Sequence, residues 1–161
     1  MNKIVIAMVI LIAAATVFFL LPDDEKKIRH NLDTLAEHFT TTDTDKSLAT
    51  LQKVAQAGKM CSDPCAVQFL SFKINRDFDR KELTDHILMM KKMLSTTRFT
   101  FHDTSISFPE EHKAEISTTL RLTGKIASDQ FTDAYEFDIG TEKIDDKWLF
   151  SSFTVVEFME H

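Results

Sequence analysis

Hydrophobic positions divide the chain into an apolar N-terminal run, a stretch with helical spacing and a stretch of alternating residues. The apolar run begins at Ile4 and ends at Leu21 (residues 4–21) and contains no charged residue. Apolar residues then recur every three or four positions until about residue 94, and every second position after Arg98. These periods predict a membrane segment, residues 1–22, followed by a single α+β domain, residues 23–161.

The apolar run is long enough for a membrane span, because a helix over residues 4–21 would cover about 27 Å. We expect an uncleaved signal-anchor that binds the lipid bilayer, since cleavage after the alanines at 13–15 would leave an apolar new N-terminus in water. Cleavage is the alternative, and it would give a secreted protein. The flanking basic residues favour neither orientation, but so short an N-terminus suits a domain translocated to the periplasmic, or exocytoplasmic, side.

Three amphipathic helices are predicted between residues 23 and 94. The first covers about 24–39, and the second is closed by Gly58, a residue type common after helix C-termini. The third follows Asp79, which is spaced to form a capping box with Glu82. The apolar stripes are Ile28, Leu32, Leu35 and Phe39 in the first helix, Leu48, Leu51 and Ala55 in the second, and Leu83, Ile87, Met90 and Leu94 in the third.

Strand signals lie in two places. A short strand is predicted over about 66–73, and four longer strands follow in the region of alternating residues after Arg98. Short connections, including the Asp145-Asp146 pair, favour an antiparallel meander with one apolar face. The fold class is therefore α+β, with three helices packed on one side of a mainly antiparallel sheet of four to six strands.

The two cysteines, Cys61 and Cys65, flank an Asp-Pro pair that favours a turn. Such a turn could bring the sulfurs together, and in an oxidising compartment we expect a structural disulfide between them. Two thiols that never pair are the alternative. The Cys-x-x-x-Cys spacing is neither a redox motif nor half of a four-cysteine zinc site.

Charge and motifs exclude several function classes. The net charge of -6 offers no basic surface for nucleic acid, and with three glycines the chain has no glycine-rich phosphate loop. No cofactor is predicted. The histidines are scattered without metal-ligand spacing, so no metal site is predicted either. They are His30, His38, His86, His102, His112 and His161.

The order of elements and the stretch Glu-Lys-Ile-Asp-Asp-Lys-Trp-Leu-Phe at residues 142–150 resemble the nuclear transport factor 2-like, cone-shaped (cystatin-like) α+β fold. The stretch looks like the last hairpin of these domains, although Asp146 stands where glycine is common. The resemblance covers about residues 23–160. It implies a strongly curved sheet whose covering helices enclose a pocket, used by isomerases and dehydratases in some members and by protein-binding domains in others.

Four polar residues on predicted strands are candidates for acid, base or oxyanion donor in such a pocket: His102, Asp103, Asp133 and Tyr135. Neighbours on a strand face opposite sides, so His102 and Asp103 can share a site only across a bulge. Exposed polar residues are the competing interpretation. The lack of a catalytic constellation favours a non-enzymatic module that binds a protein partner or a small apolar ligand. The alternatives are an isomerase, dehydratase or hydrolase, or an assembly subunit that forms a homodimer through an apolar patch on the open sheet face.

Overall fold

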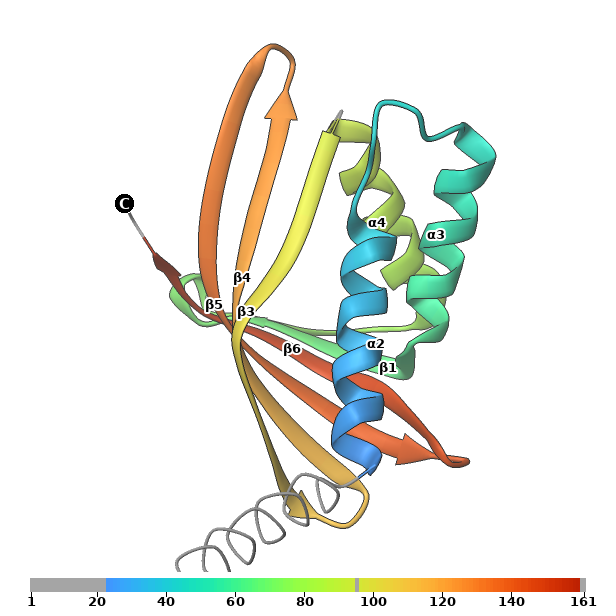
Figure 1. Ribbon diagram of the computed structural model, residues 1–161, viewed down its shortest axis with the longest axis vertical. Coiled ribbons are helices and arrows are strands. Elements are labelled where there is room, and N and C mark those ends of the chain that lie inside the picture. Colours follow the sequence, from blue (N-terminus) through green and yellow to red (C-terminus); the bar gives the residue numbers. More distant parts are fainter. Residues whose placement is uncertain (1–22, 95, 160–161) are drawn as a thin grey trace, which may run out of the picture.

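The computed structural model describes residues 23–94 and 96–159, which form three helices against one six-stranded sheet (Figure 1). The predicted membrane segment, residues 4–21, lies outside the described residues. Within them, no helix has both the length and the apolar character needed to cross a membrane. The helices are α2 (Asp23–Phe39), α3 (Ser47–Lys59) and α4 (Arg80–Met93).

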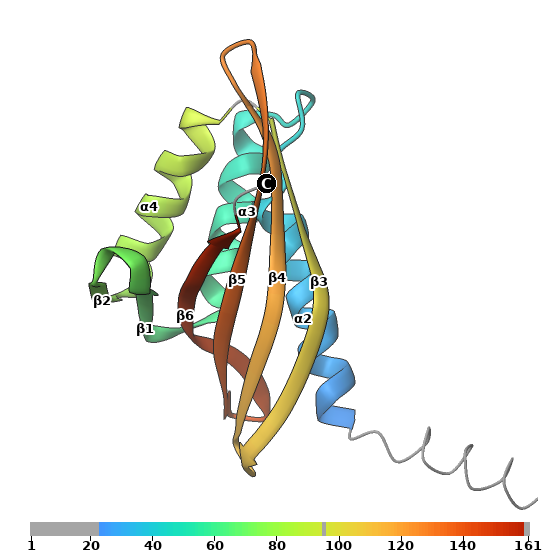
Figure 2. The same ribbon diagram turned by 90° about the vertical axis from the view of Figure 1, so that its left-hand side faces the viewer.

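The strands are arranged in the order β2-β1-β6-β5-β4-β3, and only the β1–β6 pair is parallel. The helices cover one side of the curved sheet (Figure 2), which confirms the predicted α+β architecture. The strand ranges are β1 (Cys61–Phe69), β2 (Ile74–Phe78), β3 (Thr96–Glu110), β4 (Lys113–Ile126), β5 (Asp129–Ile144) and β6 (Lys147–Met159), with the 3-10 turn η1 (Leu70–Phe72) after β1.

The single strand predicted over about 66–73 covers the end of β1 and the 3-10 turn η1, and a second strand, β2, follows it. Sequence reasoning missed β2 because this edge strand, Ile-Asn-Arg-Asp-Phe, is largely exposed and has no alternation of apolar and polar residues. The longer strands after Arg98 are confirmed, and each pairs with its neighbour along the chain. The predicted meander therefore forms most of the sheet.

A buried core lies between α2 and the half of the sheet nearest the β5–β6 turn. Its centre consists of Ile28 and Leu32 from α2, Ile116 from β4, and Trp148 and Phe150 from β6, all of which are buried. The first turn of α2 is held to the same region by an ion pair of 3.2 Å between Asp24 Oδ2 and Lys143 Nζ. The Trp148 indole, and after it the Lys143 ammonium, hold the pKa of Asp24 below its usual value.

Helix α3 differs from its prediction in two respects. Gly58 does not close it, because the helix continues through Lys59 and Met60 is the C-cap. Gly58 is buried where α3 meets α4, and a Cβ there would lie 2.7 Å from Thr84 Oγ1. The predicted stripe is also wrong, since Leu48 and Leu51 are exposed while Val54 and Ala57 are buried beside Gly58. Small residues set this face because they allow α4 to approach closely.

Two local predictions are confirmed. Asp79 caps α4 in a capping box, with its side chain accepting from the Glu82 N–H at 2.8 Å. The β5–β6 hairpin turns at Asp145 and Asp146, which have φ of 49° and 62°. Positive φ at both central residues is typical of the tight turn that matches strand twist, so aspartate occupies the conformation that glycine would adopt more easily.

Candidate functional site

An apolar cavity of about 340 Å³ lies between the concave face of the sheet and helices α2 and α4. Every strand of the sheet contributes to its wall. The lining residues are Leu35 and Phe39 of α2, Leu83, His86, Ile87 and Met90 of α4, and Cys61, Val67, Phe69, Phe78, Phe99, Phe101, Leu120, Phe137, Ile139, Phe153 and Val155 of the sheet.

The lining follows from strand alternation. The β4–β5 pairing is regular, with Leu120 opposite Tyr135 and Ile116 opposite Ile139, so alternate residues of both strands point under the helices. In β6 the register against β5 shifts between the partners of Glu136 and Phe137. This irregularity lets Val155 line the cavity while the Phe158 ring still contacts the Tyr135 ring edge-on, with 5.2 Å between the ring centroids.

Only two lining side chains, those of Cys61 and His86, carry a polar atom. The Cys61 thiol donates to the carbonyl of Ala57 at 3.5 Å. Its hydrogen bond with Cys65, together with burial, raises the pKa of Cys61, so this thiol stays protonated. The exposed cavity wall is therefore almost entirely hydrocarbon.

The predicted disulfide is not present, since Cys61 and Cys65 are both buried free thiols. The pairing of β1 with β6 is irregular between Cys61 and Ala66, at the predicted Asp-Pro turn. Here the Ser62 hydroxyl donates to the carbonyl of Pro64 at 2.7 Å. A hydrogen bond of this kind closes the turn without a bridge between the sulfurs.

The four residues predicted from the sequence form two separate places, and none of them lines the cavity. The Tyr135 hydroxyl donates to Asp133 Oδ2 at 3.3 Å, on the face of β5 that also carries Phe137. Burial, and after it the Asp133 carboxylate, raises the pKa of Tyr135. This pair is partly buried and lies nearer the start of β5 than the lining residues Phe137 and Ile139.

His102 and Asp103 are exposed on the edge strand β3. The bulge that would let them share a face is present, because the β3–β4 register shifts after His102 and Asp103 has φ of 51°. The His102 ring nevertheless contacts the Thr100 hydroxyl, with Nε2 at 3.0 Å, instead of the neighbouring carboxylate. These two residues do not form an acid–base pair in the structure.

His86 is the residue that sequence reasoning overlooked. It lies three positions after Leu83 and four before Met90, so helical spacing already placed it on the apolar stripe of α4. Its ring packs edge-on against Phe78 with 5.0 Å between centroids, and Nδ1 lies 2.8 Å from the carbonyl oxygen of Glu82. The side chain is exposed and also lines the cavity, which places it at the cavity mouth.

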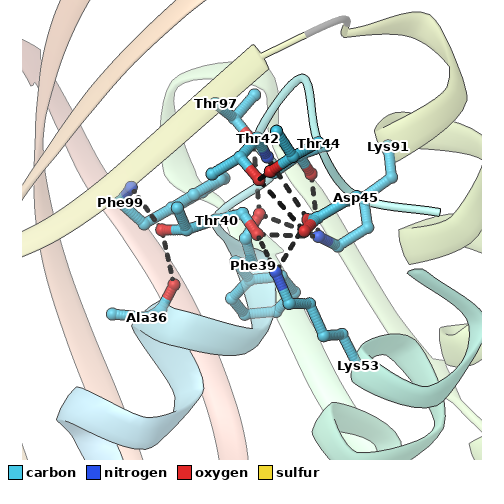
Figure 3. A network of polar contacts seen from close by, with 11 residues as sticks. Ala36, Phe39, Thr40, Thr42, Thr44, Asp45, Lys53, Lys91, Thr97 and Phe99 are labelled. Atoms are coloured by element: carbon cyan, nitrogen blue, oxygen red, sulfur yellow. Dashed lines mark hydrogen bonds and ion pairs between the residues drawn. The ribbon is translucent and has the colours of Figure 1, made fainter. Parts of the chain in front are cut away.

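A polar cluster borders the cavity where the α2–α3 connection meets β3 and α4 (Figure 3). Lys91 is buried and donates to the carbonyl of Phe39 at 3.1 Å and to Thr41 Oγ1 at 2.9 Å. Lys53 pairs with Asp45 at 2.7 Å in the same cluster. Burial, and after it the charge of Lys53, lowers the pKa of Lys91 to about 8. Among residues 23–94 and 96–159, no group of three or more potential ligands could hold a metal ion.

No protein-family model matches the sequence, and no curated protein matches it significantly. Solved structures do. The Kfla4162 protein from Kribbella flavida has a TM-score of 0.69 at 13% identity, covering 85% of this chain and 93% of that one. A Nostoc punctiforme protein of unknown function with a cystatin-like fold has a TM-score of 0.65 at 13% identity, covering 87% and 94%.

A third similar structure is a hexachlorocyclohexane dehydrochlorinase (LinA), with a TM-score of 0.67 at 11% identity, covering 84% of this chain and 87% of that one. At such identities the likeness concerns the fold and not the chemistry. The described part of the chain therefore has the nuclear transport factor 2-like, cystatin-like fold that the sequence resembled.

Proposed function

We propose that the domain is a non-enzymatic binding module that holds one small apolar ligand in its cone. The observation that carries this proposal is the cavity of about 340 Å³ with its nearly pure hydrocarbon wall. Pockets for small molecules measure about 300–1,000 Å³, and they are mostly apolar with a few polar groups. Apolar cavities stay dry and accept apolar molecules of matching size.

The outer face of the sheet favours a ligand over a protein docked on that face. On β4 the outward residues Glu115, Ser117 and Arg121 are polar and exposed. On β5 the outward Asp138 accepts a hydrogen bond of 2.7 Å from the Ser117 hydroxyl. An assembly subunit or homodimer that used this face would need an apolar patch, which these side chains do not provide.

The rival function, an isomerase, dehydratase or hydrolase, draws on LinA and on the histidine at the cavity mouth. Proton transfer in such a cone needs an acid or base matched to the reaction and a partner that orients it. The lining contains no carboxylate, and His86 Nδ1 faces a backbone carbonyl. These features support the binding function over the enzyme.

Membrane attachment through residues 4–21, with the domain on the exocytoplasmic side, remains part of the proposal. Free thiols give no support for an oxidising compartment. The proposed orientation therefore rests on the apolar run and its short N-terminal flank. Because both native cysteines are buried, a Glu111→Cys variant would carry one accessible thiol. A membrane-impermeant maleimide should label it on intact cells, and labelling only after lysis would contradict the orientation.

The ligand proposal is tested by NMR of the full chain in lipid nanodiscs with labelled methyl groups. Naphthalene, a neutral apolar probe, should shift the methyl signals of Leu120, Ile139 and Met90 and leave those of Ile28 and Ile116 unchanged. Val155→Phe should fill the cavity and weaken naphthalene binding at least about tenfold, which corresponds to roughly 1.4 kcal/mol.

A matched control places the same ring on the other face of β6. Thr154 is the neighbour of Val155 and pairs with Asp138, a residue of the outward face. Thr154→Phe should therefore leave naphthalene affinity within about twofold of the native value. If naphthalene shifts no cavity methyl, or if both variants bind it equally, the proposed function is wrong.

A further inference from the structure

Exposed apolar side chains gather around the mouth of the cavity. Phe69 lines the cavity and is also exposed, and Ile74 pairs with it directly across β1 and β2, so both side chains lie on the same face of the sheet. On the other side of the mouth, Met89 and Met93 follow His86 by one and two turns of α4. We call this surface the mouth patch, and its exposed members are Phe69, Leu70, Phe72, Ile74, Met89 and Met93.

The mouth patch is large for the surface of a monomer. Its side chains are 37–75% exposed, and Phe72 and Met93 are the most exposed of them. Together they present on the order of 600 Å² of apolar surface, since a large side chain can bury about 150–250 Å². Monomers rarely expose a contiguous apolar patch of more than a few hundred Å², and a standard interface buries about 800 Å² per partner. The mouth patch therefore has the size of an interface.

The charge of the mouth patch suits a second copy of this chain. The segments that carry it, residues 69–78 and 82–93, contain four basic and three acidic residues. Their net charge is thus +1, whereas the whole chain carries -6. Two copies of an acidic chain repel each other over most of their surface, but these two segments add no net negative charge to such a contact.

The place of the mouth patch in the domain also suits two copies in one bilayer. In Figure 2, β2 and α4 lie on the left side of the domain, whereas α2 begins at its lower end. Two copies that meet through this side, about a two-fold axis parallel to the long axis, would have both α2 starts at the same end. The proposed membrane segment ends at Leu21, two residues before Asp23. Both segments could then enter the same bilayer, where confinement raises the effective concentration of the two domains.

We propose that two copies of the chain associate side by side through the mouth patch, as a two-fold homodimer in which each copy covers the cavity mouth of the other. This inference goes beyond the proposed ligand-binding function, and the common direction of the two copies rests on the proposed membrane attachment. The interface is separate from the polar outer face of the sheet. Its formation removes the apolar side chains of both mouths from water and encloses whatever the two cones hold.

A matched pair of isoleucines tests this interface. Ile74 belongs to the mouth patch and is 51% exposed, whereas Ile126, at the end of β4, lies outside it and is 56% exposed. Full chains that carry a donor or an acceptor dye at Glu111→Cys would be mixed in liposomes, where energy transfer reports association. Ile74→Glu should weaken association at least about tenfold, because a two-fold interface contains the substitution twice. Ile126→Glu should leave it within about twofold of the native value.

A second variant keeps the test independent of strand β2. Phe72→Glu changes the 3-10 turn η1 and should weaken association as strongly as Ile74→Glu. Absence of energy transfer between native chains, or equal transfer in Ile74→Glu, Phe72→Glu and Ile126→Glu, would overturn the homodimer and leave the ligand-binding function intact. Loss of transfer in the two patch variants alone would support the homodimer, even if naphthalene shifted no cavity methyl and the ligand-binding function were wrong.

Discussion

The two halves of the concave face differ in how completely they are filled. Near the β5–β6 turn, Ile28, Ile116 and Phe150 are at most 1% exposed and do not line the cavity. In the other half of the same sheet face, Phe153 of β6 and Phe101 of β3 are only partly buried and line the cavity. The same sheet face therefore carries a buried core in one half and a cavity in the other. The placement of the helices on this face determines which half is filled.

Helix α4 cannot close over the hollow half because it is held at both ends. At its start, the Arg80 N–H donates to Asp63 Oδ1 at 3.3 Å, and Gly58 lets α3 approach Thr84. Near its end, Lys91 binds the carbonyl of Phe39. Side chains of packed cores normally collapse towards a void, but a helix fixed at two points keeps the space open. The cavity is therefore a product of polar contacts around it as much as of its apolar wall.

The largest expected effect separates the two halves through neighbouring rings on β6. Phe150 and Phe153 lie 5.7 Å apart, the first in the filled half and the second at the cavity. Phe150→Ala should lower the free energy of unfolding by about 3–5 kcal/mol, because it leaves a void in close-packed surroundings. Phe153→Ala should cost about 1–2 kcal/mol, because its ring already borders empty space and is only partly buried.

Chemical denaturation of the full chain in detergent micelles would measure both losses under the same conditions. The ratio between them is the informative quantity, since the two substitutions remove the same atoms from the same strand. Equal losses would mean that the hollow half is packed as tightly as the filled half in solution. The distinction between a core and a binding cavity would then be wrong.

The next largest effect concerns Lys91, whose hydrogen bonds to the Phe39 carbonyl and the Thr41 hydroxyl hold the end of α4. The folded protein lowers the pKa of Lys91 to about 8 from 10.5, so folding favours the neutral amine. The unfolded chain therefore binds more protons between these pH values, and stability should rise from pH 8 to pH 10.5. We expect a gain of about 1–2 kcal/mol, less than complete burial would give, because solvent screens part of the charge.

Lys91→Met should remove this pH dependence, whereas Lys92→Met, on the exposed neighbour, should retain it. At neutral pH the Lys91→Met variant should also be less stable by about 1–3 kcal/mol, because the Phe39 carbonyl and the Thr41 hydroxyl lose their donor. Denaturation at pH 8 and pH 10.5 measures both effects. A Lys91→Met variant with the native pH profile would show that another group titrates in this range.

The difference between the two halves also explains what the sequence could predict. Periodicity found α2, α4 and the four long strands, because residues such as Ile28 and Leu83 are buried at the spacing that each element imposes. Periodicity failed for α3, because the apolar side chain of Leu48 is exposed whereas the buried face includes Gly58, which has no side chain. Close helix packing selects for small size, which a hydrophobic pattern does not record.

The site was harder to predict than the fold for a related reason. The candidates chosen for their chemistry, such as His102 and Tyr135, lie outside the cavity lining. His86 carried the useful signal, a polar residue within an apolar helical stripe, but its role depends on the strands it faces. No local pattern shows that a stripe covers empty space, because the void arises from how far α4 stands from the sheet.

The smallest expected effect uses the turns at the two ends of the sheet. Asp146 has φ of 62° in the turn beside the filled half, and Ala127 has φ of 56° in the β4–β5 turn, which projects beyond the helices (Figure 1). Glycine adopts such angles without the steric cost that a Cβ carries, so Asp146→Gly should stabilise the protein by about 0.5–1 kcal/mol. Ala127→Gly should add less to the free energy of unfolding, since a hairpin end outside the packed layers can open locally while the domain stays folded.

Amide hydrogen exchange would separate the two: Asp146→Gly should slow exchange throughout the filled half, whereas Ala127→Gly should slow it only near its own turn. A global slowing by Ala127→Gly would mean that the projecting hairpin unfolds together with the core, and that the two ends of the sheet are one cooperative unit.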